Sequence, residues 1–174
     1  MSYAFVDIPD GTEVVLSIRN PSLQNLKEAI AVSQVAMFMA KALSLSQSRR
    51  DIAILTFYSA QVQCIQNALE TCRCDQVEAS RIQVMTVDSF QGSEADVVLI
   101  SFVRANAKAS VGFLKDFQRL NVALTRAKHS LILFGSAATL ESCGLHMLAN
   151  LVGDAKKRGF FFSFAELSGS VVGV

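Results

Sequence analysis

The chain has 174 residues, of which 51% are hydrophobic and 18% are charged, and its formal net charge is +1. This composition favours one compact domain and excludes an intrinsically disordered chain. The small net charge also excludes a strongly basic protein that attracts nucleic acid through its overall field, so any strand binding has to be local.

The four cysteines predict structural thiols and no zinc site. One residue separates Cys72 from Cys74, which is shorter than the usual spacer between zinc ligands, and no histidine pair stands near them. Reduced thiols are typical of cytoplasmic or nuclear proteins. We find neither a run of about 20 apolar residues nor a signal peptide at the start, so the sequence predicts no membrane contact.

The first quarter of the chain predicts two short strands and a long helix. Residues 3–7 and 14–18 are typical of strands, with Pro9-Asp10-Gly11 as the turn between them. Asn20-Pro21 favours a helix start, because Asn caps a helix and Pro fits its first position. Apolar residues at helical spacing continue to about Leu43, and a polar connection follows.

A second strand and helix follow. Residues 52–56 form an apolar run, and a helix with one apolar face then extends to about residue 72. The connection reads T-F-Y-S-A-Q, from Thr56 to Gln61. Ligands gather at the carboxyl ends of parallel strands, so this turn is a candidate binding site, with a plain strand-to-helix turn as the alternative.

The stretch from Val84 to Arg126 carries most of the chemistry. An apolar run at residues 82–85 leads into a polar turn at residues 86–96, and a fully apolar run at residues 97–103 predicts a buried strand. Residues 117–128 have helical spacing and contain Arg119 and Arg126, seven residues apart. Seven residues are close to two helical turns, so we predict that both guanidinium groups lie on one helix face and suit a polyphosphate.

Alternation of strands and helices continues to the end of the chain. Residues 130–134 predict a strand, residues 145–158 a helix and residues 160–164 a last strand. Apolar strands without polar alternation indicate a parallel sheet that is covered on both faces. The expected fold is therefore a doubly wound α/β domain with five or six parallel strands.

The motifs T-V-D-S-F-Q-G-S-E-A-D and R-L-N-V-A-L-T-R-A-K resemble motifs V, Va and VI of superfamily-1 helicases. The resemblance is closest to the branch of the nonsense-mediated-decay helicase and senataxin, and it covers nearly the whole chain. It implies that residues 1–167 are the second RecA-like domain, a three-layer sandwich of the P-loop NTPase type. Residues 168–174 are expected to form a flexible tail.

The resemblance also implies roles for individual residues. Arg126 matches the arginine finger that neutralises charge on the γ-phosphate, and Arg119 matches its companion, which either holds the γ-phosphate or positions Glu94. Gly92 allows close backbone approach to the nucleotide because it has no Cβ. The implied ATP-binding set is Gln91, Gly92, Glu94, Arg119 and Arg126.

The nucleic-acid contacts implied by the resemblance come from two turns. Thr56 and Gln61 match a segment T-P-Y-x-x-Q that touches the strand backbone, although Phe57 replaces the usual proline. Thr86 and Ser89 match hydroxyls that meet phosphates of the bound strand without reading its bases. Asp88 either orients these groups or caps local backbone. We expect the remaining basic residues near the motifs, Arg104, Lys108 and Lys128, to form a solvated rim. We expect His129 to be structural.

The chain has no G-x-x-x-x-G-K-[ST] loop and no acidic pair after an apolar run that would hold Mg²⁺, and we predict no metal ligands in it. These parts belong to the first RecA-like domain of such helicases. The resemblance therefore implies a piece of a larger helicase, in which this domain works with that first domain, ATP and Mg²⁺ on single-stranded RNA or DNA. We expect the domain to be a monomer.

Two other classes remain open from the residues. One is a non-catalytic interaction module that binds nucleic acid or a protein. The other is an unrelated flavodoxin-like nucleotide-binding domain, for which Asp10-Gly11-Thr12 is a poor phosphate loop.

Overall fold

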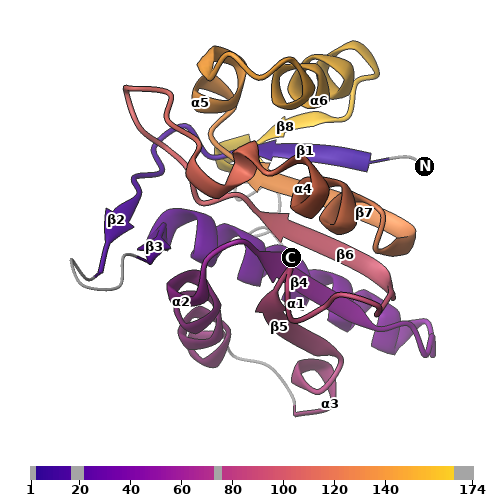
Figure 1. The fold of residues 1–174 in the computed structure, drawn as a ribbon. Coiled ribbons are helices and arrows are strands. Elements are labelled where there is room, and N and C mark those ends of the chain that lie inside the picture. Colours follow the sequence, from indigo (N-terminus) through magenta and orange to yellow (C-terminus); the bar gives the residue numbers. More distant parts are fainter. Residues whose placement is uncertain (1–2, 17–21, 73–75, 167–174) are drawn as a thin grey trace.

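A six-stranded sheet runs through the middle of the computed structural model, which describes residues 3–16, 22–72 and 76–166 (Figure 1). The strand order is β5-β4-β6-β7-β1-β8, and all neighbouring strands are parallel. A separate antiparallel pair joins β2 to β3. The strands are β1 Tyr3–Asp7, β2 Val14–Val15, β3 Leu23–Gln24, β4 Ile52–Thr56, β5 Ile82–Thr86, β6 Ala95–Ser101, β7 Ala127–Gly135 and β8 Phe161–Ser163.

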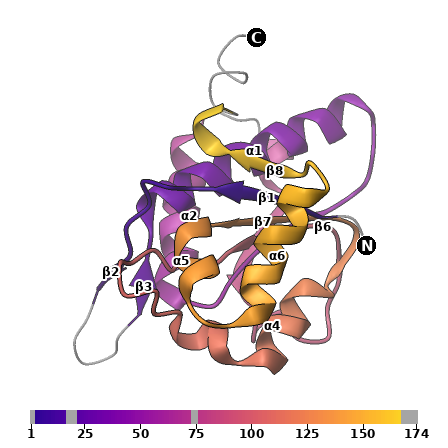
Figure 2. The ribbon, with the colours of Figure 1, turned by 90° about the horizontal axis from the view of Figure 1, so that it is seen from above.

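Helices cover both faces of the sheet. Figure 2 shows α1 and α2 on one side, and α4, α5 and α6 on the other. This arrangement confirms the predicted α/β fold of the RecA-like type. The helices are α1 Leu26–Leu45, α2 Ser59–Thr71, α3 Gln76–Ala79, the 3-10 turn η1 Gly112–Lys115, α4 Phe117–Leu124, α5 Ala137–Ser142 and α6 His146–Lys157.

The central strands are buried on both faces, which explains their unbroken apolar runs. In β4, Ile52 and Ile54 pack in the core beneath α1 and α2, whereas Ala53 and Leu55 pack in the core that also contains Leu120 of α4. All five residues of β4 are buried. Burial on both faces removes the polar alternation that a half-exposed strand would show.

The start of α1 differs from the predicted helix start. Asn20-Pro21 lies outside the described residues, and α1 begins at Leu26 with Asn25 as its N-cap. The Asn25 side chain accepts a hydrogen bond from the Glu28 backbone N–H, as an N-cap does. Residues 23–24 pair with β2 instead of forming the first helical turn, so a contact between segments overrides the local helix signal.

The helix predicted for residues 117–128 is shorter in the structure. α4 ends at Leu124, and β7 begins at Ala127, which is the register partner of Ala95 in β6. Arg126 therefore lies in the connection after the helix. The prediction that Arg119 and Arg126 share one helix face is wrong, because pairing with β6 draws residues 127–128 into the sheet.

Three short helical segments were not predicted, namely α3, η1 and α5, and the predicted strand at residues 14–18 is described only as Val14–Val15. Residues 168–174 and Cys74 lie outside the described residues.

Among the described residues, one helix is long and apolar enough to cross a membrane by length and composition, although the sequence predicts no membrane contact. It is α1, with a mean hydropathy of 1.3, and core helices of soluble proteins pass the same test. One face of α1 packs against the sheet, with Ala29, Val32, Ala36 and Ala40 fully buried.

Candidate functional site

The turn between β5 and β6 runs from the carboxyl ends of the sheet's strands to their amino ends. It leaves the carboxyl end of β5 at Thr86 and enters the amino end of β6 at Ala95, and β4 lies between these two strands. Phe90 is 3% exposed and anchors the middle of the turn in the core. One connection therefore brings polar groups to both the carboxyl and the amino ends of the strands.

Thr86 and Ser89 lie together at the carboxyl edge. Their hydroxyl oxygens are 2.8 Å apart, and the Ser89 backbone N–H donates to Thr86 Oγ1 at 3.2 Å. Ser89 is exposed and Thr86 is half-buried. This pair presents hydroxyl groups of the kind that position a phosphate backbone.

Thr56 and Gln61 lie inside the domain. Both are fully buried, and the Gln61 side chain accepts from Asn25 N at 2.8 Å and donates to Asn25 O and to Ser101 Oγ. Thr56 is the register partner of both Thr86 and Ser101, so three hydroxyl residues end neighbouring strands. Thr56 Oγ1 has no hydrogen-bond partner among the described residues. Phe57, which stands where the motif has proline, stacks on Phe102 with ring centroids 6.2 Å apart.

Residues 91–94 are all exposed at the end of the turn. Gly92 has φ +83, and a Cβ built there would have no neighbouring atom within 4 Å. Glycine is therefore required for the backbone conformation and not for space around it. Gln91 and Glu94 flank this glycine without burial, so their side chains are accessible to a ligand.

Arg126 lies against the end of this turn. Its Nε donates to Val122 O at 2.9 Å, one terminal nitrogen donates to Ser93 O at 3.4 Å, and the other donates to Thr125 Oγ1 at 3.1 Å. These bonds join the last turn of α4 to the backbone beside Glu94. Arg126 is thereby brought together with the exposed residues 91–94.

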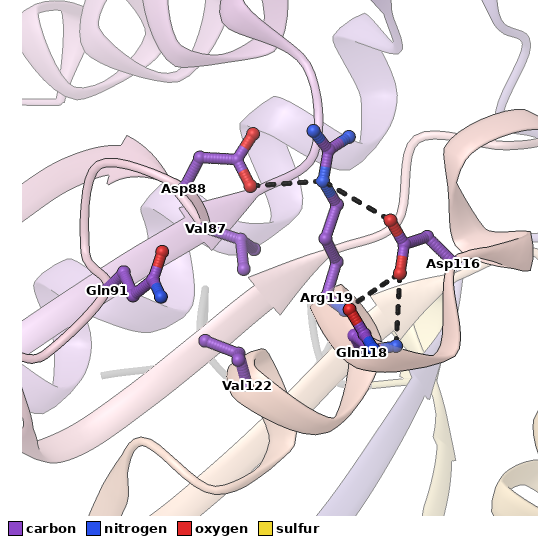
Figure 3. Close-up of a pocket in the computed structure, with 7 residues that line it drawn as sticks. All are labelled: Val87, Asp88, Gln91, Asp116, Gln118, Arg119 and Val122. Carbon is purple, nitrogen blue, oxygen red and sulfur yellow. Dashed lines mark hydrogen bonds and ion pairs between the residues drawn. The ribbon is translucent and has the colours of Figure 1, made fainter.

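Arg119 lies in a different environment, shown in Figure 3. Its Nε is 3.2 Å from Asp88 Oδ1 and 3.6 Å from Asp116 Oδ2. Asp116 is also the N-cap of α4 and accepts from the backbone N–H groups of Gln118 and Arg119. The three charged side chains border a cavity of about 360 Å³, which is lined by Val87, Asp88, Gln91, Asp116, Gln118, Arg119 and Val122.

A buried polar network at the carboxyl end of β6 was not predicted. Glu28 is fully buried and accepts hydrogen bonds from Ser101 Oγ at 2.7 Å and from the Val103 backbone N–H at 2.8 Å. Burial raises the pKa of Glu28 to about 7, against the lowering effect of its hydrogen bonds with Val103, Ser101 and Phe102. Val103 has φ +71, which is strained for a β-branched residue, and Glu28 holds its N–H in that conformation.

Arg104 follows the strained residue, and its predicted place in a solvated rim is wrong. Its side chain is 9% exposed, and its Nε lies 3.0 Å from Glu13 Oε2. The same carboxylate oxygen accepts from Ala105 N and Asn106 Nδ2, each at 2.9 Å. For the neighbouring network of Glu28, the sequence signal is the spacing from Asn25 to Glu28, which fits a capping box.

His129, which is expected to be structural, lies 3.5 Å from Asp96 Oδ1 through its Nε2. Among the described residues, no group of three His, Cys, Asp or Glu side chains could hold a metal ion.

Residues 1–138 match the family model of an AAA domain. The chain belongs to this family. It is 38% identical over 158 residues to the "probable helicase senataxin" of Homo sapiens, covering 90% of this chain and 6% of that protein. It is 36% identical over 154 residues to the "DNA replication ATP-dependent helicase/nuclease dna2" of Schizosaccharomyces pombe, covering 87% of this chain and 10% of that protein. It is 34% identical over 164 residues to the "probable helicase MAGATAMA 3" of Arabidopsis thaliana, covering 94% of this chain and 20% of that protein.

A solved structure supports the fold of this helicase domain. The C-terminal domain of a possible DNA helicase from Lactobacillus (strain WCFS1) has a TM-score of 0.51 and 17% identity, covering 93% of this chain and 84% of that chain. The family model and the senataxin and dna2 relatives support a C-terminal domain of a superfamily-1 helicase of the senataxin type, which confirms the resemblance of the motifs. The chain spans between 6% and 20% of the length of the three relatives named above.

Proposed function

We propose that this helicase domain is the second motor half of an ATP-dependent helicase and that Arg126 is its arginine finger. The observation that carries the proposal is the fixed place of Arg126, bonded to Val122 O and Ser93 O beside the exposed residues 91–94. All its hydrogen bonds within the described residues are to neutral oxygens, so its positive charge remains available to a phosphate.

The nucleotide would lie between this domain and a first RecA-like domain. Gln91, Gly92 and Glu94 would contact it from the end of the turn, and the first domain would supply the phosphate loop and the Mg²⁺ ligands. Arg126 would act on charge that develops at the γ-phosphate during hydrolysis, an effect worth roughly 10³–10⁵ in rate in other phosphoryl-transfer enzymes.

The single strand would follow the carboxyl edge of the sheet. Half-buried Thr86 and exposed Ser89 offer hydroxyl groups there, and they would contact phosphates of RNA or DNA. Thr56 and Gln61 are buried beneath this edge, so a strand contact through them needs the turn at residues 57–60 to open. Few phosphate contacts on a domain of net charge +1 predict weak binding with a shallow salt dependence.

The finger is tested by Arg126→Ala in the full-length helicase. We expect turnover at saturating nucleic acid to fall by about 10³-fold, because a finger acts mainly on the transition state, with ATP affinity nearly unchanged. Arg126→Lys should rescue little, since an ammonium lacks the planar fork. Exposed Lys128 provides the control as Lys128→Ala. Near-normal ATP hydrolysis by Arg126→Ala would refute the assignment of Arg126 as the arginine finger.

The isolated domain provides a second test. It should hydrolyse no ATP above background, because its sequence contains no phosphate loop. Nanomolar affinity of this domain alone for single-stranded RNA or DNA at physiological salt would favour an independent interaction module instead.

A further inference from the structure

Arg119 and Arg126 differ in the charge of their partners. Arg119 lies within ion-pair distance of two carboxylates, those of Asp88 and Asp116. Its Cζ also lies 5.6 Å from the centroid of the Phe113 ring. Arg126 bonds only to backbone carbonyls and one hydroxyl within the described residues.

The charge balance argues against phosphate binding by Arg119. One guanidinium with two carboxylates makes a cluster of net charge −1, and a phosphate that approaches it is repelled by the uncompensated carboxylate. Arg126 has no carboxylate of the described residues within 4 Å, so its charge is not neutralised locally. The second arginine is therefore better suited to a phosphate than the first.

Both arginines connect the same two elements. Asp88 follows Thr86 in the turn, and its ion pair attaches the beginning of that turn to α4. Arg126 attaches the end of the turn, at Ser93 O, to the last turn of α4 at Val122 O. Figure 3 shows Arg119 between Asp88 of the turn and Asp116 of α4's N-cap. A shift of the turn at Thr86 and Ser89 would therefore be transmitted through α4 to Arg126.

We propose that Arg119 is a positioning residue, which couples the strand-contacting turn to Arg126 through its ion pair with Asp88 and does not bind phosphate. This inference rests on the proposed function of the domain. The pair is exposed, with side chains that are 39% and 60% accessible, so it adds little to stability and can break and re-form as a strand binds. Asp116 offers the guanidinium a second partner when Asp88 moves.

A charge exchange in the full-length helicase tests the coupling. Asp88→Arg and Arg119→Asp should each lower the stimulation of ATP turnover by single-stranded nucleic acid about tenfold, the usual scale of coupling between sites. Turnover without nucleic acid and the KM for ATP should stay within about twofold. The double variant should recover most of the stimulation, because the ion pair is restored in reverse. Arg119→Lys should keep part of it.

Gln118→Ala is the matched control, since Gln118 lines the same cavity without taking part in the ion pairs; it should behave as wild type. A rise of about tenfold in the KM for ATP in Arg119→Asp, with no recovery in the double variant, would overturn the proposal and make Arg119 a phosphate ligand. If the proposed arginine-finger role of Arg126 is wrong, Arg126→Ala will show normal turnover whatever the charge exchange shows, so the two failures are distinguishable.

Discussion

Two regions of this domain each hold an arginine beside a carboxylate, and they differ in burial. Arg104 and Glu13 lie behind the sheet edge with side chains 9% and 16% exposed, next to the network of Glu28. Arg119 and Asp88 lie on the surface with side chains 39% and 60% exposed. A buried polar group has no water to replace a lost partner, so the first region is fixed, whereas the second can exchange partners at little cost.

The difference indicates a division of work. The buried network holds Val103 in its strained conformation and keeps the loop after β6 in place. The exposed residues of the turn and α4 are then free to respond to ligands.

Glu28→Ala should destabilise the domain by about 3 kcal/mol. It leaves the Ser101 hydroxyl and the Val103 N–H buried without their acceptor and creates a cavity. Chemical denaturation would measure the loss. Gln34→Ala, at an exposed position of α1, should change stability by less than about 0.5 kcal/mol. An equal effect of the two variants would contradict the contrast.

The unfolding free energy should also depend on pH through Glu28. Its folded pKa of about 7 lies above the ordinary value of 4.5, so the folded state retains a proton that the unfolded state loses. The stabilisation is complete below about pH 4.5 and is lost as the pH rises to about 7, by about 3 kcal/mol in total. Glu28→Gln should remove this slope. Parallel pH profiles of the two proteins would show that Glu28 has no raised pKa.

Gly112→Ala should destabilise by about 2 kcal/mol. Its φ is +50, and a Cβ there would lie 2.5 Å from an Arg104 terminal nitrogen and 2.9 Å from the Tyr58 hydroxyl. Gly153→Ala in α6 is the control, because nothing lies within 4 Å of the added Cβ, and it should stabilise by about 0.5–1 kcal/mol. Thermal unfolding would compare them. A tolerated Gly112→Ala would mean that the Arg104 site is not tightly packed.

Arg119→Ala and Asp88→Ala should each alter the unfolding free energy by less than about 1 kcal/mol, since exposed ion pairs contribute little. The loss should shrink further at high salt, where such pairs are screened. A loss of several kcal/mol in either variant would place this pair with the fixed region and remove the contrast.

Much of the architecture could be predicted because its signals are local. The apolar runs at β4 and β6 identified buried parallel strands, and the six-stranded sheet confirms them. Element ends were predicted less well. Asn20-Pro21 favours a helix start, yet the cap is Asn25, because residues 23–24 pair with β2. The helix signal after residue 124 likewise gives way to pairing between β7 and β6.

Local sequence patterns were enough to predict the type of domain, the turn with its glycine, and the two arginines that accompany it. These features were predictable because strand burial, turn chemistry and motif order depend on neighbouring residues. The position of Arg119 between Asp88 and Asp116, the place of Arg126 after the helix, and the burial of Gln61 and Arg104 became known from the folded domain. These facts depend on contacts between segments far apart in the chain, and no local pattern specifies which partner a charged side chain meets.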